Sequence, residues 1–183
     1  METFFIVFWI IVLIVIFITI ATYAIGGMSA APWVPLWKKD IRRMMQLANV
    51  KPGETLYDLG AGDGRMVLIA AKEFGAQATG FEIATLPYLL AYIKIKLLGL
   101  SGQANDGQAK IRYRNFFKQD FSKADVICIF LTPKAMKKLK LKLQKEVKPG
   151  ARIISYAFHL PGWTETKKDK PNQKTTAIYI YQK

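Results

Sequence analysis

A long apolar run near the N-terminus sets the first constraint on the fold. The 22 residues from Phe4 to Ile25 carry no charge, and residues 4–18 are all Phe, Ile, Val, Leu or Trp. At about 1.5 Å per residue, a helix of this length spans roughly 33 Å, which matches the hydrocarbon core of a bilayer. The 14 Ile, Leu, Phe and Val residues within 4–18 favour insertion by about 4 to 8 kcal/mol. We therefore predict one N-terminal transmembrane helix, with residues 1–30 as an anchor and residues 31–183 as a separate domain.

The flanks of this run distinguish a retained anchor from a cleaved signal peptide. Small residues at 29–31 would suit a signal peptidase, but no basic residue precedes the run, which is also longer than the roughly 7–15 residues of a signal-peptide core. We therefore favour an anchor. All 27 Lys and Arg residues lie from Lys38 onward, and four of them fall within 38–43. By the positive-inside rule they would hold the domain on the cytoplasmic side, or on the matrix side of a mitochondrial membrane.

The connector between anchor and domain, residues 26–35, reads GGMSAAPWVP. Two glycines and two prolines are expected to end the helix and to leave only a few extended residues. The domain is therefore expected to lie close to the lipid headgroups.

The rest of the chain alternates short apolar runs with segments of helical periodicity. Helices are predicted at 41–47, 65–74, 86–98 and 133–147. Strands are predicted at 55–59, 78–81, 111–117, 125–131, 151–158 and 175–181. Strands joined through helices form a mostly parallel α/β sheet that helices cover on both faces. The polar alternation of the third strand predicts an edge position, and the last strand, which follows its predecessor without a helix, is expected to be antiparallel.

The composition excludes several kinds of protein. With one Cys and one His, the chain can form neither an internal disulfide nor a Cys/His zinc site, and no metal site is predicted. Cys128 lies in the apolar run VICIF and is interpreted as a core residue.

The turn after the first predicted strand carries the clearest chemical signal. Residues 56–65 read LYDLGAGDGR, in which glycines permit a sharp turn and close approach of a ligand to the backbone. The spacing differs from that of a dinucleotide site, because Arg65 replaces the third glycine and Asp63 puts a carboxylate where a pyrophosphate needs donors. A cofactor with a cationic amino-acid end fits better than NAD. Glu82, at the end of the second strand, could accept hydrogen bonds from ribose hydroxyls.

These residues carry a resemblance. YDLGAGDGR followed by ATGFEI resembles motif I and the following acidic residue of class I, seven-β-strand S-adenosylmethionine-dependent methyltransferases. The apolar N-terminus, the PWVP connector and the closing ISYAFHLPGW are more narrowly similar to membrane-anchored protein-lysine methyltransferases of the ATP synthase c subunit and the adenine nucleotide translocase, and to their prokaryotic relatives. The resemblance implies a Rossmann-like class I methyltransferase sheet, S-adenosylmethionine as cofactor, and a lysine of a membrane protein as acceptor.

The resemblance also implies roles for individual residues. The cofactor would be bound by Asp58, Gly60, Ala61, Gly62, Asp63, Glu82, Ile83, Asn115 and Phe116. Asp58, Gly60, Gly62 and Asp63 would surround its amino-acid end, and Glu82 its ribose. Asn115 with Phe116 would lie at its adenine, although the family usually has Asp in place of Asn115. The acceptor channel would be lined by residues 32–35, 132–133 and 158–163, with Thr132, Pro133 and Trp163 as its catalytic residues.

Simpler interpretations stand beside these roles. Asp58 could cap the following helix, Glu82 could be a solvated strand end, and Trp33, His159 and Trp163 could be surface or packing residues.

Two alternatives to lysine methylation stay open at this stage. One is methylation of a lipid or a small amphiphile, and the other is a membrane-tethered module that binds S-adenosylmethionine without turnover. The Lys-rich helix at 133–147 is either a solvated face or a basic surface for anionic headgroups. Nucleic acid is an unlikely partner for an enzyme held at a bilayer, and residues 130–133, FLTP, differ from the Asn/Asp-Pro-Pro-Tyr of enzymes that methylate bases or glutamine.

Overall fold

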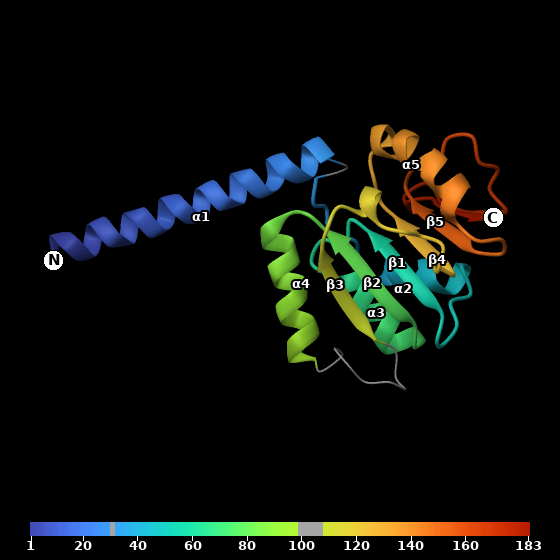
Figure 1. The fold of residues 1–183 in the computed structure, drawn as a ribbon, viewed down its shortest axis with the longest axis horizontal. Helices are drawn as coiled ribbons and strands as arrows, with labels where there is room; N and C mark the ends of the chain where they lie inside the picture. The colour runs from blue at the N-terminus through green and yellow to red at the C-terminus, as the bar shows by residue number, and fades with distance from the viewer. Residues whose placement is uncertain (30–31, 99–107) are drawn as a thin grey trace.

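A long helix projects from an α/β domain (Figure 1). The computed structural model describes residues 1–29, 32–98 and 108–183. Helix α1 runs Glu2–Ser29, and within the described residues its stretch Glu2–Ala21 is the one long and apolar enough to cross a bilayer, with none of its most apolar part buried. A signal sequence would meet the same criteria of length and composition, so α1 is a candidate span.

Helix α1 extends further than predicted. It continues through Gly26 and Gly27 to Ser29, so the expectation that the two glycines end it is wrong. A glycine in a helix costs only about 1 kcal/mol relative to alanine, which a helix of 28 residues can absorb. Residues 32–37 then lead to the domain without regular secondary structure.

In the described part of the chain, seven strands form one sheet in the order β3-β2-β1-β4-β5-β7-β6. The first five are mutually parallel, namely β1 (Thr55–Leu59), β2 (Gln77–Glu82), β3 (Ala109–Tyr113), β4 (Val126–Ile129) and β5 (Arg152–Tyr156). β7 (Ile178–Gln182) lies antiparallel between β5 and the short edge strand β6 (Lys167–Asp169). The predicted sheet, with its third strand at an edge and its last strand antiparallel, is confirmed.

Hydrophobic clusters attach helices to the opposite faces of this sheet. The first joins α2 (Lys38–Leu47), α3 (Arg65–Phe74) and Ile95 of α4 (Thr85–Leu97), and the second contains α5 (Pro133–Glu146). Because side chains alternate along a strand, Cys128 belongs to the first cluster, and its neighbours Ile127 and Ile129 to the second. Cys128 is fully buried, in agreement with its interpretation as a core residue.

Most strand bounds differ from the prediction by one to three residues, and two differences are larger. The third strand ends at Tyr113 rather than Phe117, because the Asn115 side chain accepts a hydrogen bond from the Phe117 backbone and starts a 3-10 turn, Phe116–Lys118. The strand β6 has no apolar pattern and was not predicted; it forms through pairing with β7.

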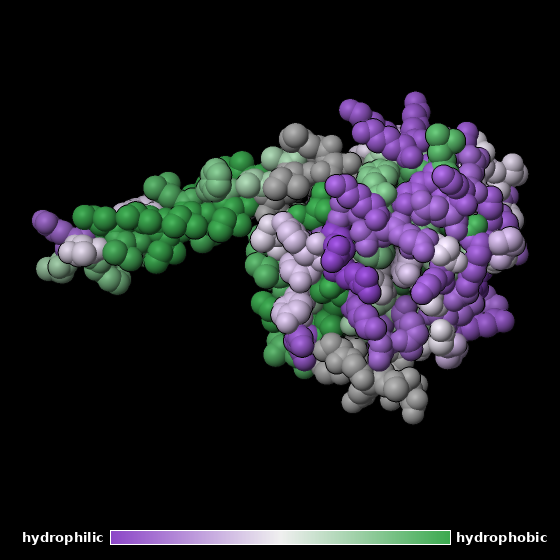
Figure 2. Space-filling model, in the orientation of Figure 1, coloured by the Kyte–Doolittle hydropathy of each residue, from purple (hydrophilic) through white to green (hydrophobic). Residues whose placement is uncertain are grey.

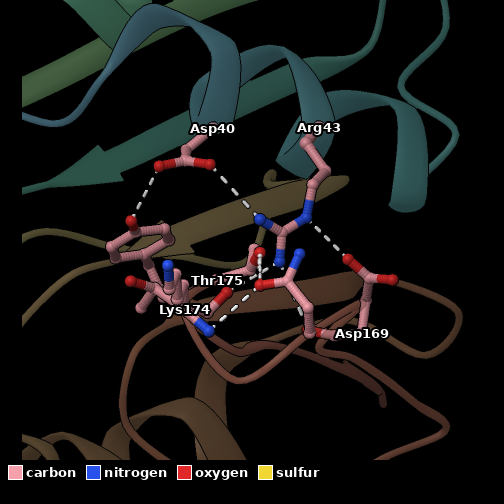
Figure 3. Close-up of polar contacts among 8 residues, drawn as sticks. Asp40, Arg43, Asp169, Lys174 and Thr175 are labelled. Atoms are coloured by element: carbon pink, nitrogen blue, oxygen red, sulfur yellow. Dashed lines mark hydrogen bonds and ion pairs between the residues drawn. The ribbon is translucent and has the colours of Figure 1, made fainter.

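A polar cluster ties α2 to the C-terminal strands (Figure 3). The Arg43 guanidinium donates to Asp169 Oδ2 at 2.6 Å, to Asp40 Oδ1 at 3.2 Å and to the Thr176 carbonyl at 2.7 Å. The Tyr156 hydroxyl donates to the other oxygen of Asp40 at 2.9 Å. The helix that follows the connector is thereby fixed to the sheet.

Candidate functional site

A cavity opens at the carboxyl ends of the parallel strands, between β1 and β4. Successive strands run outward on either side of this point, and open α/β sheets place ligands in such a crevice. Its walls come from the loop after β1, the end of β2, residues 114–117, the end of β4 and the connector at 32–36. The space between these walls amounts to about 910 Å³, part of which is open solvent.

The loop after β1 approaches the connector closely at Gly62. Its φ of +55° lies in the left-handed region that glycine tolerates best. A Cβ at this position would lie 2.8 Å from Cδ1 and Nε1 of Trp33, so the indole ring covers the glycine. Glycine is therefore required here by a contact within the chain, in addition to the ligand approach that the sequence suggested.

Asp58 places a buried carboxylate at the end of β1, where it lines the cavity. The residue is 5% exposed, and its carboxylate accepts no hydrogen bond from any residue that the structure describes. Burial, and then the nearby carboxylates of Glu82 and Asp63, raise the pKa of Asp58 from 3.8 to about 7. It does not cap α3, whose N-cap is Gly64. A cationic hydrogen-bond donor on a bound ligand would stabilise the ionised form of this buried carboxyl group.

Glu82 organises the backbone around it. Its carboxylate accepts hydrogen bonds from the backbone N–H groups of Gly62 at 2.8 Å, Ile83 at 2.8 Å and Ala84 at 2.7 Å. It is 9% exposed, so it is not a solvated strand end. A carboxylate offers about four acceptor positions, and these three bonds join the loop after β1 to the turn after β2.

Asp63 is paired with two cations. Its oxygens accept hydrogen bonds from Arg65 at 2.8 Å and from Lys94 of α4 at 2.6 Å. Burial would raise the pKa of Asp63, but the hydrogen bonds and charges of Arg65 and Lys94 outweigh it and hold the pKa below its ordinary value. Arg65 also donates to the Leu36 carbonyl at 2.8 Å, so this ion pair fastens the connector to the loop.

The connector forms one wall of the cavity. Residues 32–36 all contribute to the lining, which agrees with the expectation for 32–35. The Nε1 of Trp33 is buried and has no hydrogen-bond partner among the described residues. Trp33 is therefore part of the site and not a surface residue.

Aromatic residues form the opposite end of the cavity. Asn115, Phe116 and Phe117 line it from the segment after β3, and Phe81 and Ile83 from β2 and its following turn. The rings of Phe116 and Phe117 have centroids 4.4 Å apart. The Asn115 Oδ1 is held by the Phe117 backbone at 2.9 Å, so the amide nitrogen is the group that it can offer to a ligand.

The predicted cofactor residues come together at the cavity, but the three predicted catalytic residues, Thr132, Pro133 and Trp163, lie outside its lining. Thr132 and Pro133 begin α5, where the Thr132 hydroxyl accepts from the Ala135 backbone at 3.4 Å, and the cavity is bounded nearby by Phe130 and Leu131. Trp163 packs edge-on against the Tyr181 ring, and its Nε1 is buried without a partner among the described residues.

His159 lies outside the cavity lining. His159 is exposed and lies 3.0 Å from Glu165. Within the described parts of the chain, no group of three His, Cys, Asp or Glu side chains is arranged to hold a metal ion.

Several site residues were not predicted as such, among them Phe81 and Phe117 of the lining and three residues that hold the loop after β1. Arg65 was noted only as a departure from a dinucleotide motif, and Leu36 contributes a backbone carbonyl that no side-chain pattern reveals. Lys94 pairs with Asp63, which lies 31 positions earlier in the sequence. In the sequence, Lys94 stands out only as one of two charged residues in an otherwise apolar helix.

Comparison with protein families and curated proteins gives consistent results. The model of the ANTKMT methyltransferase domain matches residues 58–167. A protein-lysine N-methyltransferase of Saccharolobus islandicus is 38% identical over 153 residues, which cover 82% of this chain and 92% of the relative. Two mammalian relatives are the human lysine N-methyltransferase of the ATP synthase c subunit, 34% identical over 73% of this chain, and the mouse adenine nucleotide translocase lysine N-methyltransferase, 32% identical over 72%. The match spans only 54% and 55% of those two proteins.

A solved structure shares the fold and part of the sequence. The RNA methyltransferase from Salinibacter ruber, in complex with S-adenosyl-L-homocysteine, superposes with a TM-score of 0.74 at 30% identity, over 81% of this chain and 93% of its own.

Proposed function

The chain belongs to the ANTKMT family of S-adenosylmethionine-dependent protein-lysine methyltransferases, and from this premise we propose that its acceptor is a lysine side chain of a membrane protein. The observation that carries the proposal is the construction of the cavity. One wall holds a buried acid suited to the cofactor, and another is the connector that leads directly from the candidate span.

The residues of the cavity fit S-adenosylmethionine. When bound, this cofactor supplies an electrophilic methyl group on a sulfonium to a nucleophile that attacks in line. Asp58 would hold its cationic amino group, because this carboxylate is buried and lacks any donor among the described residues. The loop at 60–63 would lie against its amino-acid end. Glu82 and Ile83 would meet the ribose, with Phe116 and the Asn115 amide at the adenine.

The nucleophile has to be a neutral amine. Deprotonating a lysine of pKa about 10.4 at pH 7 costs about 4.6 kcal/mol. In this site the apolar side chains of Trp33, Val34 and Leu131 line the cavity, and desolvation among them lowers the pKa of an entering amine. Positive charge on the domain acts in the same direction, so we assign no general base. Catalysis would rest on alignment of the two reactants.

The anchor limits which acceptors are reached. We propose residues 1–30 as a membrane anchor and residues 31–183 as the methyltransferase domain, placed by the basic residues at 38–43 on the cytoplasmic or matrix side. The relatives named for the ATP synthase c subunit and the adenine nucleotide translocase support a protein acceptor. Thr132, Pro133 and Trp163 stay predictions for the acceptor side.

Transfer of labelled methyl groups tests the proposal. The full-length protein in detergent would be incubated with labelled S-adenosylmethionine and membranes from a strain that lacks it. Hydrolysed protein, extracted lipid and RNA are counted separately, and the Asp58→Asn variant serves as a control. Label in methyl-lysine of a membrane protein is the expected result. Label confined to lipid, to RNA or to soluble protein would contradict the proposed acceptor.

A further inference from the structure

Helix α4 has an apolar face that the described part of the domain does not cover. Its inner side is buried through Pro87, Ala91 and Ile95. On its outer side, Leu89 is 46% exposed, Ile93 51% and Leu97 81%. A helix that is apolar all round is normally buried on every side, so this outer face is expected to have an apolar partner.

Only one of the two charges of α4 lies on this face, because Lys96 follows Leu89 by seven residues and Ile93 by three. Lys94 points to the cavity loop, where it pairs with Asp63 at 2.6 Å. The Lys96 ammonium lies 5.7 Å from the centroid of the Tyr92 ring, which is itself 43% exposed. An aromatic ring beside a long lysine is typical of the water–lipid boundary, where the apolar stem is buried and the ammonium stays hydrated.

The position of α4 beside α1 indicates that lipid covers the outer face of α4. The two helices are in contact, and α4 runs across the direction in which α1 leaves the domain (Figure 1). If α1 spans a bilayer, α4 therefore lies along the membrane surface. Figure 2 shows hydrophobic side chains over α4 on the side from which α1 projects.

The length of α1 sets the distance of α4 from the hydrocarbon core of the bilayer. Beyond the uncharged run 4–25, whose helical length matches the hydrocarbon core, residues 26–29 continue the helix, for about 6 Å at ~1.5 Å per residue. The headgroup layer on each side of a bilayer is about 5–8 Å thick. The domain end of α1 therefore emerges near the headgroups, and α4 with it.

The basic helix α5 is placed differently. It lies on the side of the domain away from the free end of α1 (Figure 1). Its exposed side carries lysines, and Leu141, 71% exposed, is its large exposed apolar residue. This placement favours α4 over α5 as the element nearest a bilayer, in contrast to the basic surface that the sequence suggested.

We propose that the outer face of α4, formed by Leu89, Tyr92, Ile93 and Leu97, inserts into the lipid headgroup and acyl boundary and orients the domain on the membrane. This proposal rests on the membrane anchoring in the proposed function. An interfacial helix of this kind is buried by about 5–10 Å. Two contacts, α1 through the bilayer and α4 along it, would fix the rotation of the domain, which one span alone leaves free.

Fluorescence quenching by brominated lipid tests this contact in the full chain. Single cysteines at Leu89→Cys or Ile93→Cys would carry an environment-sensitive fluorophore, with Leu141→Cys as the matched exposed leucine on α5. Native Cys128 can be kept, because it is fully buried and burial raises the pKa of its thiol. The proteins are reconstituted into phosphatidylcholine and phosphatidylglycerol vesicles with or without brominated phosphatidylcholine, and iodide is used as the aqueous quencher.

The proposal predicts that brominated lipid quenches the α4 labels several-fold more than the Leu141 label, and that iodide shows the reverse order. Equal quenching at α4 and α5 would overturn it. Protection of the α4 labels from both quenchers would also overturn it, because a protein would then cover the face. An Ile10→Cys label on α1 separates this failure from a failure of anchoring, and S-adenosylmethionine binding by each labelled protein shows that its domain is folded.

Discussion

Replacing Asp58 with Asn removes the carboxyl group on which the cofactor assignment depends. In the free protein this group is buried without a donor among the described residues, and burial together with the Glu82 and Asp63 carboxylates raises its pKa to about 7. A rise from 3.8 corresponds to about 4 kcal/mol at 1.36 kcal/mol per unit. Because the folded state binds the proton more tightly, this stability is complete below about pH 4 and is lost as the pH rises to about 7. Asp58→Asn should therefore unfold at higher denaturant concentration than the wild type at pH 8, and the difference should shrink toward pH 4.

The effect on cofactor binding has the opposite sign. A hydrogen bond to a charged group contributes about 1.5–3 kcal/mol, so the variant should bind S-adenosylmethionine about 10- to 150-fold more weakly at pH 8. In the wild type, protonation of Asp58 competes with binding, and the dissociation constant should rise up to about tenfold per unit as the pH falls below 7. The variant should lack this pH dependence.

Isothermal titration calorimetry from pH 5 to 8, with chemical denaturation of the free proteins in the same detergent, measures both effects. A variant that gains stability at pH 8 but loses cofactor affinity would match the reasoning. Unchanged affinity, or a wild-type affinity that does not weaken below pH 7, would refute the assignment of Asp58 to the cationic end of the cofactor.

Three further substitutions test the packing around the site. Gly62→Ala places a Cβ 2.8 Å from the Trp33 ring at a φ of +55°. The substitution should therefore cost about 1–3 kcal/mol of stability and weaken cofactor binding. In denaturant titrations, adding Trp33→Ala to the same chain should restore part of this stability. Ala157 has a φ of +69°, and Ala157→Gly should raise the free energy of unfolding by about 0.5–1 kcal/mol; a lower denaturation midpoint would show that the turn is not strained. Arg43→Met should cost about 2 kcal/mol, because its guanidinium donates to several partly buried acceptors. Arg42→Met breaks a more exposed ion pair and should lower the denaturation midpoint much less; equal losses would contradict this ranking.

The sequence predicted the fold well because its signals are local. Alternation of apolar runs and helical periods gave the order of strands and helices, and the missing helix before β7 gave its antiparallel direction. Strand β6 has no such signal, since Lys167–Asp169 are polar and form a strand only where β7 offers a partner. The end of β3 was misjudged because Asn115 forms a local side-chain bond that competes with strand backbone.

The sequence predicted which residues form the cofactor site, but it did not predict which of the acidic side chains are paired with cations or with backbone donors. The sequence spacing places Asp58, Asp63 and Glu82 near one turn but does not distinguish the charge states of these three carboxylates. In the structure, Lys94 and Arg65 neutralise Asp63, and backbone donors hold Glu82. Lys94 lies 31 positions from Asp63, and the donors to Glu82 are main-chain atoms, so no local pattern could assign these partners. Arg65 lies only two positions from Asp63, but its pairing with that carboxylate was not predicted.

Contacts between the connector and the loop after β1 link the proposed anchor to the cofactor-binding cavity. Arg65 holds both Asp63 and the Leu36 carbonyl, and Trp33 covers Gly62, so the segment leaving α1 is fixed against the loop at the cofactor end of the cavity. If α1 is the proposed anchor, the cavity lies close to the point where α1 leaves the membrane, and an acceptor has to reach it near that level. A lysine close to the membrane surface meets this condition, whereas one exposed far from the bilayer does not. Position relative to the membrane would therefore contribute to substrate selection alongside the residues that surround the lysine.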